Sequence, residues 1–129
     1  TYSDWVDVCR WIAGSETIPA QTTFLTPKLS ATFKWRTGRA EVVNWKDIPQ
    51  DARSIVEWRE RLADVFGPRN DVQDTRWHEP LATQGAASLQ RLGEKYGAEY
   101  VVTAAQPRVV GLERLYANGT YAVYRLNTK

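Results

Sequence analysis

The chain has 129 residues, of which 43% are hydrophobic and 25% charged, with a formal net charge of +2. These values are typical of one globular domain, and so small a charge does not by itself favour nucleic acid as a partner. The single Cys9 excludes an internal disulfide and a cysteine-based zinc site. Because His78 is the only histidine, histidine-based metal sites and Ser-His-Asp or Cys-His catalysis have little to build on.

Methionine is absent from the sequence, and a helix start follows Thr1 almost directly. We therefore expect that the chain is a piece of a longer protein, which holds any chemistry that this piece lacks. No apolar run approaches the roughly 18 residues that a membrane-spanning helix needs, so we expect any such span to lie outside this piece.

Helical and strand patterns alternate along the chain. Trp5, Cys9 and Ile12 recur at i, i+4 and i+7 and indicate one apolar helix face. The predicted elements, in chain order, are a helix over residues 3–14, a strand over 22–26, a segment over 29–37 that is either a short helix or a turn, a strand over 40–45, a helix that opens at 47–49 and ends before 67, a helix over 83–97, a strand over 98–103 and a hairpin over 112–126.

Several polar residues mark the ends of these elements. Asp47 is expected to cap the helix that follows it, with Asp51 as an acid in the first turn. Thr83 is expected to cap the next helix, and Gly97 suits the position after its end.

The order of elements predicts a single three-layer α/β domain, with a mainly parallel short central sheet flanked by helices. A C-terminal antiparallel hairpin is expected to extend one edge of this sheet. The pair Asn118-Gly119 is a strong hairpin signal and predicts a type I′ turn. Asn118-Gly119-Thr120 is formally a glycosylation sequon, but the predicted turn is enough to explain why these residues occur here.

A basic segment rich in aromatic residues, residues 28–46, is the first candidate for a ligand site. It holds five lysines and arginines against one acid, Glu41. Such a segment could bind a phosphate or carry a stacked base or sugar. In the alternative interpretation, the aromatic rings pack in the core and the charges are solvated.

Asp47 follows a predicted strand end, where open α/β sheets usually bind ligands. The predicted ligand-binding residues are Lys34, Arg36, Arg39, Lys46 and Asp47. The sequence contains neither a P-loop nor a GxGxxG fingerprint, and we predict no catalytic residue, cofactor or metal.

Several runs of the sequence, spread over nearly the whole chain, resemble a poorly characterised family. They are Trp5-Val6-Asp7-Val8-Cys9-Arg10-Trp11-Ile12, Thr23-Phe24-Leu25-Thr26-Pro27, Phe33-Lys34-Trp35, Val42-Val43-Asn44-Trp45-Lys46-Asp47, Lys95-Tyr96-Gly97-Ala98-Glu99-Tyr100-Val101-Val102 and Tyr121-Ala122-Val123-Tyr124-Arg125-Leu126. The family is the soluble C-terminal domain of bacterial multi-pass membrane proteins. Those proteins are similar to glycosyltransferases that use lipid-linked sugars, including oligosaccharyltransferase-like proteins.

The resemblance implies a soluble α/β tail on the extracytoplasmic, periplasmic side of a membrane. Its implied partner is the membrane-embedded part of the same polypeptide, and its implied ligand is a lipid-linked sugar or an anionic glycan. In such proteins the catalytic carboxylates usually lie in loops between membrane helices, so no catalytic residue carries over to this chain.

The leading functional hypothesis is therefore a non-catalytic extracytoplasmic domain of a polytopic membrane protein. The alternative is a small free-standing α/β enzyme or phosphate-ligand-binding module, with a site near Asp47 that includes Lys46 and His78. A nucleic-acid binder is a third reading, but the nearly balanced charge argues against it, so no nucleic acid partner is expected.

Overall fold

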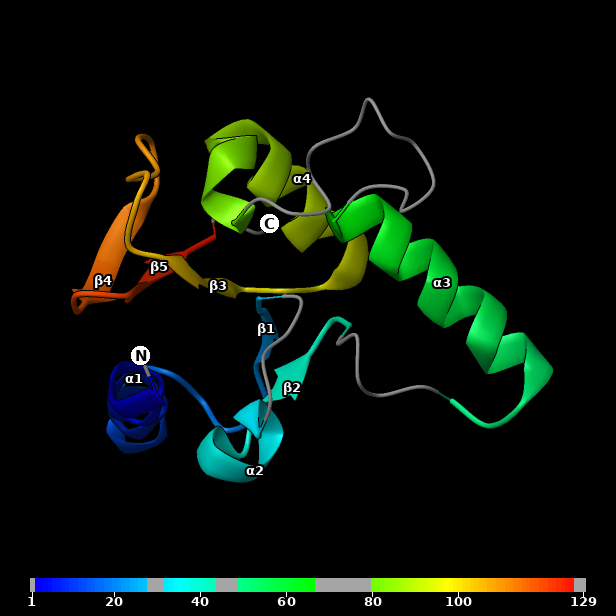
Figure 1. The fold of residues 1–129 in the computed structure, drawn as a ribbon, viewed down its shortest axis with the longest axis horizontal. Helices are drawn as coiled ribbons and strands as arrows, with labels where there is room; N and C mark the ends of the chain where they lie inside the picture. Colours follow the sequence, from blue (N-terminus) through cyan, green and yellow to red (C-terminus); the bar gives the residue numbers. More distant parts are fainter. Residues whose placement is uncertain (1, 28–31, 44–48, 67–79, 127–129) are drawn as a thin grey trace.

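The computed structural model of the protein describes residues 2–27, 32–43, 49–66 and 80–126 (Figure 1). Helices and strands alternate along these ranges as the sequence predicts. The elements are α1 (Tyr2–Gly14), β1 (Thr23–Leu25), α2 (Phe33–Thr37), β2 (Ala40–Glu41), α3 (Ala52–Phe66), the 3-10 helix η2 (Leu81–Gln84), α4 (Ala86–Tyr96), β3 (Tyr100–Ala104), β4 (Glu113–Ala117) and β5 (Tyr121–Arg125).

The five strands form one mixed sheet in the order β2-β1-β3-β5-β4. β1 pairs in parallel with β2 and β3, whereas β5 runs antiparallel to both β3 and β4. The α/β class and the hairpin at one edge are confirmed. The expectation of a mainly parallel sheet was wrong, because β1 and β2 are only three and two residues long and the hairpin supplies the longer pairings.

Neighbouring strand residues enter two separate apolar clusters, as the alternation of side chains along a strand requires. Phe24 and Val102 lie in one cluster with residues of α1 and α2. Leu25 and Val101 lie in the other with residues of η2, α4 and the end of α3. The fold thus depends on burial from both sides of short strands, and each fully buried apolar side chain contributes roughly 1.5–3 kcal/mol.

The helix α3 covers less of the sheet than the sequence predicts. Its buried residues, Leu62, Val65 and Phe66, all belong to its C-terminal end. Ile55 and Trp58 lie at helical spacing from Leu62 and Val65 but are only partly buried. The first turns of the helix extend away from the sheet in Figure 1. The three stacked layers expected from the sequence are therefore not confirmed.

The cap of α3 differs from the prediction. The helix begins at Ala52, and the Asp51 carboxylate accepts a hydrogen bond of 2.9 Å from the backbone N–H of Ser54. This bond lowers the pKa of Asp51 below its ordinary value. Asp51 is therefore the residue that caps the helix, whereas Asp47, the predicted cap, lies outside the described residues.

The start of α4 also lies later than predicted. The Thr83 hydroxyl donates to the Pro80 carbonyl oxygen at 2.8 Å, and Thr83 belongs to η2. Gly85, at φ 84°, separates η2 from α4, so the prediction of Thr83 as the cap was wrong. The predicted end is confirmed, because Gly97 has the left-handed conformation that commonly stops a helix.

A side chain shapes the turn of the hairpin. Neither Asn118 nor Gly119 has a positive φ, so the predicted type I′ turn was wrong. Instead the Asn118 side-chain oxygen accepts hydrogen bonds from the N–H groups of Thr120 and Tyr121, at 3.0 and 2.8 Å. The Asn118 amide and the Thr120 hydroxyl donate to Asp4, which ties the turn to α1 and occupies the sequon residues.

Candidate functional site

The three predicted ligand-binding residues that the structure describes lie in different surroundings. Lys34 lines a cavity of about 280 Å³ beside α3, whereas Arg36 lines another of about 320 Å³ between α1 and α2. Arg39 is buried. Lys46 and Asp47 lie outside the described residues, as does His78, so the alternative site near Asp47 stays a prediction.

Arg39 stabilises the fold through hydrogen bonds to the backbone. Its side chain is 8% exposed, and its guanidinium donates to the carbonyl oxygens of Thr37 at 2.7 Å and of Ile18 at 2.6 Å. These bonds fasten the loop after α1 to the end of α2. The Nε atom is buried and has no hydrogen-bond partner in the part of the chain that the structure describes, which adds to the cost of burying this cation.

The cavity between α1 and α2, called here the α1–α2 cavity, lies beside exposed aromatic residues. Its lining consists of Val6, Cys9, Arg10, Ala13, Trp35 and Arg36. The Arg36 guanidinium lies 5.2 Å from the ring centre of Trp35 and 5.5 Å from that of Tyr2. Trp35 is 79% exposed and Tyr2 is 71% exposed. The rings and the cation therefore form a polar and aromatic surface that the core does not use.

Thr32 fixes the position of Arg36. Its hydroxyl oxygen accepts hydrogen bonds from Arg36 Nε at 3.0 Å and from Trp5 Nε1 at 3.3 Å. Arg36 also donates to the Tyr2 hydroxyl. Thr32 has φ 68°, a left-handed conformation that costs a β-branched residue about 1–3 kcal/mol. The hydrogen bonds and the packing of Trp5 hold this residue in place.

The cavity beside α3 has a different chemical character. Its charged lining residues are two cations, Lys34 and Arg61, and two carboxylates, Glu41 and Glu57. Arg61 donates to the Val42 carbonyl oxygen at 3.0 Å, and Glu41 accepts from Thr26 at 2.7 Å. Among the described lining residues these charges balance one another, which does not favour a ligand of either sign.

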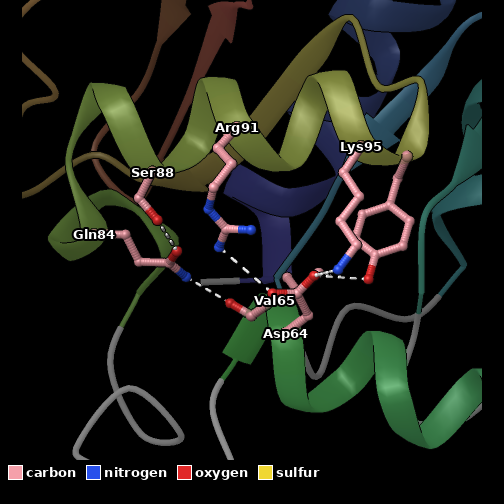
Figure 2. A network of polar contacts seen from close by, with 7 residues as sticks. Asp64, Val65, Gln84, Ser88, Arg91 and Lys95 are labelled. Atoms are coloured by element: carbon pink, nitrogen blue, oxygen red, sulfur yellow. Dashed lines mark hydrogen bonds and ion pairs between the residues drawn. The ribbon is translucent and has the colours of Figure 1, made fainter.

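A polar network joins the C-terminal end of α3 to α4 (Figure 2). The Asp64 carboxylate accepts hydrogen bonds from Lys95 at 2.7 Å and Tyr96 at 2.8 Å, and it lies 3.4 Å from Arg91. Burial would raise the pKa of Asp64, but the hydrogen bonds from Lys95 and Tyr96 outweigh it and hold the pKa below its ordinary value. We call this network the Asp64 clasp.

Sequence reasoning missed the Asp64 clasp, because its partners are about 30 positions away and no local pattern links them. A second contact lies beside it. The Gln84 amide donates to the Val65 carbonyl oxygen and accepts from Ser88 (Figure 2). Together these contacts join α3, η2 and α4. The side chains in them hold the helices against one another.

Cys9 has no nucleophilic character. Its side chain is fully buried in the core, and burial raises the pKa of the thiol to about 12. The thiol is therefore protonated at neutral pH, whereas nucleophilic attack requires the thiolate. Within the described ranges, no three His, Cys, Asp or Glu side chains lie close enough together to hold a metal ion.

The comparisons with known proteins leave the activity open. Residues 3–65, just under half of the chain, match the model of a family described as a domain of unknown function, DUF6798. No curated protein and no solved structure matches the chain. The match fits the expected link to an uncharacterised domain family, while the membrane-protein and glycosyltransferase-like parts of the resemblance stay predictions. Among the described residues, no helix has the length and apolar character to cross a bilayer.

Proposed function

We propose that this chain is a non-catalytic binding domain on the extracytoplasmic side of a polytopic membrane protein. The observation that carries the binding role is the surface of Tyr2, Trp35 and Arg36 beside the α1–α2 cavity. Large aromatic rings left in solvent, next to a cation held in place, are typical of recognition surfaces.

The structural roles of Asp64, Arg39 and Cys9 support a non-catalytic function. Asp64 accepts hydrogen bonds that pack α3 on α4, and Arg39 donates to two backbone carbonyl groups. The Cys9 thiol is buried and protonated. Each of these groups contributes to the packing or hydrogen bonding of the fold.

The membrane setting rests on the family resemblance. In this proposal the partner is the membrane-embedded part of the same polypeptide, of a glycosyltransferase-like type that uses lipid-linked sugars. The domain would pack on that part and help to shape its groove for substrate or acceptor.

The reading frame around residues 1–129 tests the membrane setting first. Hydrophobic spans encoded upstream of Thr1 would support it, whereas a start codon immediately before Thr1 and a stop codon after Lys129 would contradict it.

Cysteine labelling in intact cells tests the side of the membrane. Val110 is 85% exposed, while Cys9 is fully buried and gives a low background. A V110C variant of the full-length polypeptide should react with a membrane-impermeant maleimide before lysis, with the unsubstituted protein as the control. Labelling of V110C only after lysis would place the domain on the cytoplasmic side and overturn this part of the proposal.

A further inference from the structure

We propose that the α1–α2 cavity binds a small ligand in which a phosphate or carboxylate is attached to a ring that stacks on Trp35. This inference rests on the proposed function as a binding domain, and it names the ligand class and the residues that bind it. A sugar phosphate and a nucleotide both have this chemistry.

The charge of the cavity favours an anion. Among the described residues, its lining includes two arginines, Arg10 and Arg36, and no carboxylate. Asp7 lies 4.0 Å from Arg10, but both side chains are more than half exposed, and such pairs are weak in water. Counted over the residues that the structure describes, the lining of the cavity beside α3 is balanced in charge, whereas that of the α1–α2 cavity is positive.

The exposed ring of Trp35 favours a ligand with a flat face. Trp35 is 79% exposed, so it adds little to the stability of the core. An indole ring in this state can stack with a nucleobase or with the apolar face of a sugar ring, and the tryptophan side chain loses little entropy on binding. The cavity volume of about 320 Å³ suits a small molecule rather than a polymer.

The position of Arg36 is established before a ligand arrives. Its contacts with Thr32 and Tyr2 use two of the five N–H donors of the guanidinium, at Nε and Nη2. The remaining N–H donors lie in the plane of the same guanidinium, which already contacts the Trp35 ring. A phosphate or carboxylate can therefore accept hydrogen bonds from Arg36 without the cost of ordering this side chain.

An NMR titration of the 129-residue chain tests the inference. The probes are glucose 1-phosphate for the sugar arm and AMP for the nucleobase arm, with inorganic phosphate and glucose as references. At least one ring-bearing phosphate should bind roughly tenfold tighter than either reference, because ring and anion contribute together. The indole N–H signal of Trp35, assigned by its loss in W35A, should shift on binding.

Three variants separate the contributions of ring and charge. W35A should lower the affinity to that of inorganic phosphate, and R36Q should lower it roughly tenfold or more, because a charge-assisted hydrogen bond is lost. The matched control is K34Q, which removes a cation from the same short helix but on the side of the other cavity. K34Q should bind as the unsubstituted chain does, and the spectrum of each variant checks its fold.

Several results would overturn the inference. They are equal affinity for inorganic phosphate and both ring-bearing probes, no shift of the Trp35 signal at millimolar ligand, or an unchanged affinity in W35A and R36Q. Binding of phosphatidylglycerol vesicles without binding of either probe would also overturn it, since the surface would then be a membrane contact. The reading frame and the cysteine labelling report on the proposed membrane setting independently of these results.

Discussion

At the scale of single residues, Gly93 shows how closely the last helix packs on the end of the chain. A Cβ atom at this position would lie 2.8 Å from Leu126 Cδ1 and 2.9 Å from the Ala98 carbonyl oxygen. The leucine side chain could move away, but the carbonyl oxygen belongs to the backbone that leads into β3. Glycine is therefore required here for space, although it weakens the helix intrinsically.

We expect Gly93→Ala to lower the free energy of unfolding by roughly 1–3 kcal/mol, the usual cost of overpacking. Gly14→Ala is the control, because a Cβ atom there has no atom within 4 Å and alanine favours a helix. Denaturant unfolding of both variants measures the difference. Equal stability of the two would show that the end of α4 can shift without cost.

A second residue-scale prediction concerns Arg39. Arg39→Met should reduce stability by roughly 1–3 kcal/mol, because the carbonyl groups of Ile18 and Thr37 lose their donor. The removal of a desolvated cation offsets part of this loss. Arg53→Met is the matched control, since the Arg53 side chain is 91% exposed, and we expect a change within roughly 0.5 kcal/mol. An Arg39→Met variant as stable as this control would refute the structural role.

At the scale of elements, the packing of α3 on α4 combines apolar burial with the Asp64 clasp. Only the C-terminal end of α3 is buried, so the clasp holds the part of the helix that carries the apolar contacts. The Asp64 side chain is 21% exposed, which leaves its hydrogen bonds partly shielded from water. The clasp should therefore stabilise the protein more than an ordinary surface ion pair does.

We expect Asp64→Asn to reduce stability at neutral pH by roughly 1–2 kcal/mol. The pKa of Asp64 is lower in the folded protein than the value of 3.8 in the unfolded chain. The stabilisation by its charged carboxylate is therefore fully present above pH 3.8 and is lost as the pH falls through the pKa of the folded state. The stability difference between the two proteins should therefore shrink below pH 3.8.

Denaturant unfolding across the acidic range measures this difference. Asp7→Asn is the control, because Asp7 lies 4.0 Å from Arg10 on the exposed side of α1. A difference for Asp64→Asn that stays constant down to the lowest pH would contradict the assignment of the clasp to a charged carboxylate.

At the scale of the whole molecule, the first half of the chain depends on the second half. The region that matches the domain of unknown function ends at residue 65, yet β1 pairs with β3 on one side. Phe24 and Leu25 lie in clusters that also contain Val102 and Val101 of β3. Hydrogen bonds to Asp4 also join the hairpin turn between β4 and β5 to α1.

We therefore expect a fragment of residues 1–66 to remain unfolded in isolation. It keeps one pairing of two very short strands, and two-stranded sheets are at best marginally stable in water. The fragment should give an NMR spectrum with narrow amide dispersion and no cooperative unfolding transition, while the 129-residue chain should give both. A dispersed spectrum for the fragment would show that residues 1–66 form an independent domain.

The sequence by itself determined the order of elements, the apolar face of α1, the glycine that ends α4 and the place of the hairpin. These features follow from local rules, namely the period of apolar residues, the left-handed conformation open to glycine and the ability of an asparagine side chain to accept hydrogen bonds in a turn. It also indicated residues 28–46 as the segment of interest, and Arg36 from that set lies at the proposed site.

Only the tertiary structure decided the direction of strand pairing, the burial of Arg39 and the distribution of the cations between two cavities. Lys34 and Arg36 are two positions apart on α2 and point toward different neighbours, a distinction that charge counting cannot make. Tyr2, which accepts a hydrogen bond from Arg36, and Tyr96, which donates to Asp64, each lie more than 30 positions from that residue. Such contacts depend on how whole elements pack, and no local pattern in the sequence encodes that packing.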